Sequence, residues 1–325
     1  MFDFIGRRKV WFLLSAFFLL VSLGGLVGRG LNLGIDFTGG MTMDAIFAHP
    51  VASAQVRVVL DRQGLGGSNI TMVGSTGHEV LMNFPAVSEA RRTALNAALS
   101  KQLGRFQIVS LNKVTGVVSQ ALVRQGLLAV LVAVLLIILY MSFRFDFRFA
   151  LSGIVAIFYD VLVSIGLVAL VHVQLTTAFV AAVLTIIGYS LNDRIIIFDR
   201  IRENLKLMRK ETLATIANRS LNQTLVRSVN TAVTVLLAMA SILIFGGATT
   251  RDFAVTMLIG VFFGAYSSIF VATPIWVGWS EWDERSKAAS RRAATAAPNK
   301  KDDPKGEAPK ALKRGKGLKV AKSGK

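Results

Sequence analysis

Residues 175–198 read LTTAFVAAVLTIIGYSLNDRIIIF, an apolar stretch long enough to cross a lipid bilayer that nevertheless contains Asp193 and Arg194. A helix needs roughly 20 mostly apolar residues to span the hydrocarbon core. Further runs of this kind lie at residues 10–27, 122–141, 149–171, 225–245 and 253–276. The whole chain is 53% hydrophobic and only 17% charged, whereas soluble domains carry about 25% charged residues. The sequence therefore predicts an α-helical membrane protein with six transmembrane helices.

Basic residues are distributed unevenly along the chain and indicate its orientation. The net charge is +18, and lysine and arginine concentrate before the first run, in segments 144–148 and 200–219, and after the last run. These segments all lie on one side of the predicted membrane path, which the positive-inside rule assigns to the cytoplasm. We therefore expect cytoplasmic termini and an external segment at residues 32–120. The first run is longer than a secretory h-region and lacks a clear cleavage site, so we expect a retained span.

The segment between the first and second runs has the composition of a small soluble domain. Strands are predicted at residues 41–47, 69–73, 79–84 and 106–114, and helices at residues 52–63 and 88–103. Ser88 is a suitable N-cap for the second helix, and Gly104 follows its end. The order strand–helix–strand–strand–helix–strand is that of the ferredoxin-like split βαβ arrangement. The predicted fold class thus includes one small α+β external domain between the first and second transmembrane helices.

These observations divide the chain into four parts. They are the cytoplasmic N-terminus with the first transmembrane helix (residues 1–30), the external domain (31–120), a five-helix transmembrane bundle (121–279) and a basic tail (280–325). The tail has almost no large apolar groups, so we predict a disordered cytoplasmic segment. It either reinforces orientation as a solvated tail or attracts anionic lipid or ribosomal RNA. In the last run, the spacing of Gly260 and Gly264 allows two helices to approach closely.

Ionisable residues inside a membrane span indicate, by default, a transport pathway or a proton relay. Asp193 lies about six residues before the cytoplasmic end of the fourth run, and Arg227 lies about six residues inside the fifth. Both are then on the order of 9 Å inside the same face, on adjacent antiparallel helices. Two interpretations stay open: a structural salt bridge, or an acid whose proton affinity is set by a movable cation. Arg194 is expected to extend to the membrane interface.

Other polar groups occur at comparable depths. Asp160, near the middle of the third run, is expected to be neutral or partnered. Asp252, at the outer start of the sixth run, is either a solvated interfacial charge or the external mouth of a proton path. Hydroxyl and amide groups nearby either hold water files or bond helices together. They are Tyr189, Ser190, Asn192, Tyr266, Ser267 and Ser268.

The sequence lacks the residue patterns on which most enzymes depend. It contains no cysteine, and its three histidines, His49, His78 and His172, are scattered without ligand spacing. Neither a disulfide nor a zinc site is therefore predicted. No nucleophile–base pair or phosphate-binding loop is recognisable. We predict a protein that is not an enzyme and that uses neither a cofactor nor a metal.

Several motifs give the chain a specific family resemblance. They are GIDFTGG at residues 34–40, GYSLND at 188–193 followed by FDRIREN at 198–204, NRSLNQT at 218–224 followed by Arg227, and YSSIF at 266–270. Together they resemble the signatures of the SecF branch of the SecD/SecF family, in the resistance–nodulation–division superfamily. The first of these motifs places Gly34, Asp36, Gly39 and Gly40 directly after the first span.

The resemblance implies an accessory subunit of the Sec export machinery in the bacterial inner (plasma) membrane, with a periplasmic external domain. Its implied partners are SecD, the SecYEG channel, the SecA motor, YajC, YidC and a translocating preprotein. The implied energy source is the proton-motive force. The family's transport-critical residues fall on Asp193, Arg227 and Asp252. Tyr159 stands where the family commonly has His before Asp160, so a proton role for Asp160 stays an open alternative.

Two other functions are compatible with the composition. A small-molecule exporter of the same superfamily usually has two six-span halves and two large external domains, and this chain has one of each kind at most. A purely structural subunit that stabilises SecD or the channel is disfavoured only by the intramembrane charges Asp193 and Arg227.

Overall fold

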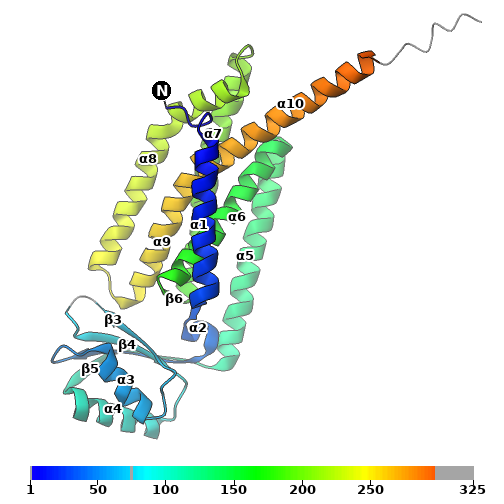
Figure 1. The fold of residues 1–325 in the computed structure, drawn as a ribbon. Coiled ribbons are helices and arrows are strands. Elements are labelled where there is room, and N and C mark those ends of the chain that lie inside the picture. Colours follow the sequence, from blue (N-terminus) through cyan, green and yellow to red (C-terminus); the bar gives the residue numbers. More distant parts are fainter. Residues whose placement is uncertain (1, 74–75, 297–325) are drawn as a thin grey trace, which may run out of the picture. The chain divides into compact units, whose positions relative to one another are not determined.

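Long helices make up most of the structure, a computed structural model that describes residues 2–73 and 76–296 (Figure 1). Within the described residues, six helical segments are long and apolar enough to cross a membrane, as predicted. They are α1 (Arg8–Arg29), α5 (Gly116–Arg144), α6 (Phe147–Leu170), α7 (Thr177–Leu207), α8 (Leu213–Phe245) and a continuous segment made of α9 (Ala248–Ser267), the π-helical turn η1 (Ser268–Ala272) and α10 (Thr273–Ala296). Residues 1–281 form one compact unit, and residues 282–325 belong to a second.

Helices α7 and α8 extend beyond their apolar runs and are joined by the short connection 208–212. Thr212 caps α8, because its hydroxyl accepts a hydrogen bond from the Thr215 N–H at 3.2 Å. Asn204 of α7 donates to the Ser220 hydroxyl at 2.8 Å and to the Gln223 side-chain oxygen at 2.9 Å, both on α8. The polar segment that follows the fourth run is thus mostly helical and ties the two helices together.

The α+β domain contains the β-α-β-β-α-β order predicted from the sequence. Its elements are β2 (Gly40–Phe47), α3 (Ser53–Arg62), β3 (Asn69–Val73), β4 (Glu79–Phe84), α4 (Glu89–Leu103) and β5 (Phe106–Val114). The strands form an antiparallel sheet in the order β3-β4-β2-β5, and both helices cover one face of it (Figure 1). Met43, Val56, Leu95 and Leu99 are buried between them. Ser88 caps α4, as predicted, by accepting from the Arg91 N–H.

A two-stranded connection joins the start of this domain to the start of α7. Strand β1 (Asn32–Leu33) pairs in parallel with β6 (Gln174–Leu175). The short helix α2 (Ile35–Thr38) follows. The Asp36 carboxylate accepts hydrogen bonds from the Thr177 N–H at 2.8 Å and the Thr177 hydroxyl at 2.9 Å. A Cβ at Gly34 would lie 2.8 Å from the Leu175 carbonyl oxygen, which explains the glycine there.

Small residues allow the helices of the bundle to approach closely. A Cβ at Gly260 would lie 2.0 Å from Ile186, and one at Gly264 would lie 2.2 Å from the Ser190 hydroxyl, so both glycines admit side chains of α7. This agrees with the close helix approach expected from their spacing. Helices α5 and α8, in contrast, leave most of their surface exposed.

The second unit is described only as far as residue 296. Helix α10 continues past residue 280, where the sequence predicts a disordered tail to begin, and ends at Ala296. Asp283 and Lys287, four residues apart on this helix, form an ion pair at 2.8 Å. The remainder of the predicted tail, residues 297–325, lies outside the described residues.

Candidate functional site in the membrane bundle

Asp193 is a buried carboxyl group on α7, and hydroxyl groups of two neighbouring elements lie beside it. Its Oδ1 accepts a hydrogen bond from the Ser228 hydroxyl of α8. The Ser268 hydroxyl of η1 faces the same carboxyl while donating to the Gly264 carbonyl oxygen at 2.8 Å. The Oδ2 atom has no hydrogen-bond partner within the described part of the chain. One carboxylate oxygen is therefore fixed, and the other is available to carry a proton.

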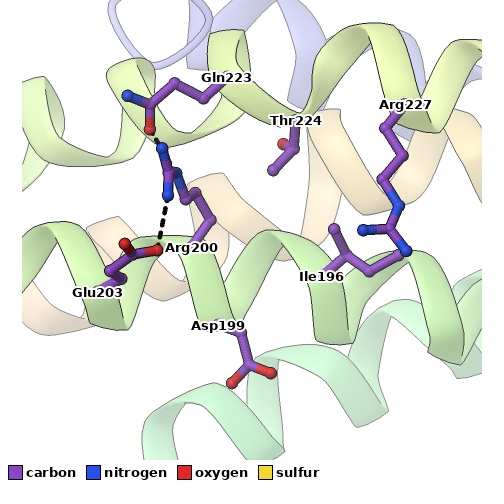
Figure 2. A pocket seen from close by; sticks show the side chains of 7 residues that line it. All are labelled: Ile196, Asp199, Arg200, Glu203, Gln223, Thr224 and Arg227. Atoms are coloured by element: carbon purple, nitrogen blue, oxygen red, sulfur yellow. Dashed lines mark hydrogen bonds and ion pairs between the residues drawn. The ribbon is translucent and has the colours of Figure 1, made fainter.

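Arg227 lies one residue before Ser228 on α8 and is exposed. Figure 2 shows its side chain extending from α8 toward Ile196 of α7. Its side chain lines an open polar pocket of about 400 Å³ between α7 and α8. The other lining residues are Ile196, Asp199, Arg200, Glu203, Gln223 and Thr224. Figure 2 shows Arg200 bridging the Glu203 carboxylate at 2.6 Å and the Gln223 side-chain oxygen at 2.7 Å. Asp193 and Arg227 are thus not ion-paired in this structure, although the Arg227 charge acts on the carboxyl from a distance.

Arg194 lies on a different face of α7 and is fully buried. One of its guanidinium nitrogens, Nη2, donates both to the Asp160 carboxylate of α6 and, at 2.7 Å, to the Ser267 hydroxyl. The prediction that Arg194 extends to the membrane interface is therefore wrong. Depth along the helix suggested it, but the residue faces α6 and the end of α9, where Asp160 compensates its charge. Asp160 is accordingly partnered, which was one of the two states expected for it.

The other polar residues predicted near Asp193 are only partly gathered around it. Tyr266 turns toward α1, where its hydroxyl meets the Ser15 hydroxyl at 3.0 Å and donates to the Trp11 carbonyl oxygen at 3.2 Å. It thus bonds helices together. Asn192 is exposed, and Tyr189 is half-buried on α7. Ser268 lies beside Asp193, whereas Ser267 and the buried Ser190 lie beside the Asp160–Arg194 ion pair.

The outer polar residues lie far from this cluster. Asp252 precedes Ser268 by 16 positions, which is roughly 24 Å along a helix. Its carboxyl lies beside the Gln174 backbone, near the connection that Gly34 and Asp36 make to α7. The structure therefore does not bring Asp252 or the first motif to Asp193.

Sequence reasoning missed two contributors to the site. Ser228 was overlooked because a single serine in an apolar run usually bonds to its own helix, yet here it reaches Asp193. The position of Ser228 next to Arg227, and four residues after Thr224, could have indicated that it faces the same polar region. Arg194 was overlooked as a partner for Asp160 because the two lie 34 positions apart in the sequence. Among the described residues, no group of His, Cys, Asp and Glu side chains is arranged to hold a metal ion.

The fold and the site define a polytopic membrane protein that carries ionisable side chains inside its bundle and a small α+β domain between its first two spans. Comparison with known families identifies the family to which this chain belongs. Residues 94–282 match the family "Protein export membrane protein SecD/SecF, C-terminal", and residues 24–45 match the "SecD/SecF GG Motif". The chain belongs to the SecD/SecF family of protein export membrane proteins.

Similar proteins are named SecF or SecDF. Protein translocase subunit SecF of Magnetococcus marinus is 39% identical over 90% of this chain and 97% of its own length. The SecF of Sebaldella termitidis is 38% identical over 82% of this chain and 88% of its own length. A crystal structure of SecDF, described as a translocon-associated membrane protein from Thermus thermophilus, gives a TM-score of 0.78 at 35% identity, covering 86% of this chain. The chain spans 39% of that longer SecDF chain.

Proposed function

We propose that this protein is an accessory subunit of the Sec translocase that works with a SecD partner to drive preprotein export with the proton-motive force. The similarity to SecF subunits over most of the chain supports the assignment. The SecDF relative is more than twice as long as the aligned part, which supports a SecD that supplies the rest. In this proposal the bundle lies in the bacterial inner membrane, the termini are cytoplasmic, and residues 31–120 form a periplasmic ferredoxin-like domain. SecYEG, SecA, YajC and YidC would be the wider partners.

The observation that carries the proposal is the arrangement of Asp193 and Arg227. Asp193 is buried with one unpartnered oxygen, and Arg227 lines a polar pocket on the other side of Ser228. A guanidinium that moves toward the carboxylate favours its ionised form, and one that moves away favours the protonated form. Movement of Arg227 between the pocket and Asp193 would therefore bind and release one proton per cycle. A proton crossing 100 mV supplies about 2.3 kcal/mol.

The exposed face of α8 supports a membrane-embedded partner. Gln223, Arg227, Asn230, Thr234 and Ser241 are all exposed, and their spacing of three, four and seven places them on one face of the helix. Polar and charged side chains in a membrane usually face protein or water rather than lipid. Hydrogen bonds from such side chains across helices contribute about 0.6–2 kcal/mol each. We propose that SecD covers this face and completes the site around Arg227.

The connection between the α+β domain and α7 supports mechanical coupling. Asp36 holds the first turn of the helix that carries Asp193. In the proposed cycle, a change in the charge of Asp193 that shifts α7 would move the domain through this contact. The domain would then act on the emerging preprotein, with no chemical catalysis by this subunit.

The variant Asp193→Asn tests the proposal in inverted membrane vesicles that contain the SecD complex. It keeps the side-chain shape but removes the titration, so proton-dependent export should be lost while ATP-driven translocation by SecA persists. Asp146→Asn is the matched control, because Asp146 is an exposed carboxyl directly before α6 that makes no side-chain capping hydrogen bond. We expect it to retain most of the activity.

The outcome also separates the proton role from a purely structural one. Full proton-dependent export by Asp193→Asn would contradict the proposal. Failure of this variant to copurify with SecD, with Asp146→Asn unaffected, would favour a structural subunit instead.

A further inference from the structure

Two neighbouring charged residues of α7 each contact one of two neighbouring serines, which lie where α9 meets η1. Arg194 donates to the Ser267 hydroxyl at 2.7 Å, and Asp193 faces the Ser268 hydroxyl. Successive residues of an α-helix point about 100° apart, because each turn takes 3.6 residues. The charges of Asp193 and Arg194 are therefore directed to different neighbours although they are adjacent in the chain.

The serines lie at a break in the regular helix. Residues Ser268–Ala272 form a π-helical turn, and the Thr273 hydroxyl donates to the Ser268 carbonyl oxygen at 3.2 Å. Single π-helical turns are rare, and they occur frequently at functional sites. Here the π-helical turn begins at Ser268, directly after Ser267. The helical hydrogen-bond pattern therefore changes at the two serines that contact Arg194 and Asp193.

Asp160 completes the set from α6. Its carboxylate and the Arg194 guanidinium have exposed fractions of 1% and 0%. Removing one partner of such a buried pair leaves an uncompensated charge and is strongly destabilising, whereas replacing both is often neutral. Arg194 is thus held by Asp160 and Ser267 together, on the side of α7 that does not meet α8.

We propose that the Asp160–Arg194 ion pair is a positioning element that keeps Arg194 away from Asp193, and that Asp160 itself does not carry the transported proton. This inference rests on the proposed function, in which Asp193 is the proton carrier. Without Asp160, the buried Arg194 guanidinium would have the Asp193 carboxylate as its nearest alternative partner. A permanent cation beside Asp193 would favour its ionised form, so a higher proton concentration would be needed to protonate it.

The charged and titratable groups around this site come from each helix packed against it. On α7 they are Tyr189, Asp193 and Arg194; α6 contributes Tyr159 and Asp160, α8 contributes Arg227, and α9 contributes Tyr266. Helix α1 contributes the Ser15 hydroxyl, which has no charge. The Arg194 charge already acts on both Asp160 and Asp193. Removing the Asp160 carboxylate should therefore change the electrostatic environment of Asp193.

The test compares the pH dependence of proton-driven export for three forms of the SecD complex in membrane vesicles. For Asp160→Asn we expect export to persist, with the pH of half-maximal activity lowered by about one unit or more, a tenfold rise in the proton concentration required. For the double variant Asp160→Asn/Arg194→Gln, which removes both charges, we expect the wild-type pH profile. A merely structural role would change thermal stability without moving the pH profile.

The results distinguish a positioning role for Asp160 from a role in carrying the proton. Loss of proton-driven export at every pH in both the single and the double variant would make Asp160 a proton carrier and overturn the inference. Unchanged pH profiles in both would overturn it as well. If Asp160→Asn alone fails to fold, a folded double variant with the wild-type profile supports the pair, and an inactive double variant contradicts it. Activity of Asp193→Asn would instead contradict the proposed function, independently of Asp160.

Discussion

At the scale of single residues, the direction that each side chain takes from its helix decides its role. Asp193 and Arg194 have nearly the same depth along α7, yet Asp193 contacts α8 and Arg194 contacts α6. Sequence position predicts depth well, because the rise per residue is constant. It does not predict which face of a helix a neighbour will cover. For this reason the intramembrane carboxyls were found from the sequence, whereas the Asp160–Arg194 pair was not.

A buried carboxyl in the α+β domain gives a prediction that is independent of transport. Asp44 is buried in β2, and its Oδ1 has no partner within the described residues. Burial, followed by the nearby charge of Glu79, raises the pKa of Asp44 above its ordinary value of 3.8. The native state therefore binds this proton more tightly than the unfolded state. Its contribution to stability is fully present below pH 3.8 and is lost as the pH rises through the raised pKa.

The variant Asp44→Asn cannot ionise and should therefore raise the thermal midpoint of the domain at pH 7. We would measure thermal unfolding of residues 36–118 by circular dichroism at pH 3 and pH 7. The difference from the wild type should disappear at pH 3. Asp61→Asn, at an exposed position of α3, should change little at either pH. A variant less stable than the wild type at pH 7 would show that the carboxylate is favourably held.

At the scale of secondary-structure elements, contact between α1 and α6 depends on a glycine. A Cβ at Gly166 of α6 would lie 2.3 Å from the backbone oxygen of Ser22 in α1, and backbone cannot rotate away as a side chain can. Overpacking of this kind typically destabilises a protein by about 1–3 kcal/mol. We expect Gly166→Ala to lower the thermal midpoint of the purified complex.

Gly24→Ala is the matched control for this contact. Gly24 lies in α1, two residues after Ser22, but a Cβ at this position would have no neighbour within 4 Å. Alanine is the better helix former by roughly 1 kcal/mol, so this variant should be at least as stable as the wild type. Equal stability of Gly166→Ala and Gly24→Ala would mean that the two helices are not packed as described.

The elements themselves were largely predictable, and the exceptions have a physical cause. The long apolar runs and the alternating strands of the α+β domain are strong periodic signals. Strands β1 and β6 have only two residues each, too few for any periodicity. Their pairing brings Asn32 beside Gln174, a long-range contact that local sequence does not encode. A disordered tail was predicted from residue 280, whereas α10 continues to Ala296, because a basic, alanine-rich segment is compatible both with a helix and with disorder.

At the scale of the whole molecule, the orientation in the membrane follows from the basic segments and can be measured directly. The chain has no cysteine, so single cysteines report cleanly. Ala97 is exposed on α4, and Ser286 is exposed on α10. In intact cells with a permeable outer membrane, Ala97→Cys should react with an impermeant thiol reagent, and Ser286→Cys should react only after lysis. Labelling of both in intact cells would contradict the proposed topology.

The whole-molecule account requires two halves of one site, one from this chain and one from SecD. In the proposed cycle, Asp193 with Ser228 would form the proton-binding side, and Arg227 lies at the exposed face of α8 that a partner would cover. The short contact between Asp36 and Thr177 then connects the start of α7 to the α+β domain. Under the proposed function, a proton bound at Asp193 would be linked through this contact to movement of the α+β domain.

Proton flux through the assembled complex would show whether Asp193 carries the proton. The complex of this chain with SecD would be reconstituted in liposomes that contain a pH-sensitive dye, and acidification would be followed after an inward proton gradient is applied during preprotein translocation. We expect flux in the wild type and in Asp146→Asn, and background flux in Asp193→Asn with the complex intact. Undiminished flux through the intact Asp193→Asn complex would contradict the account.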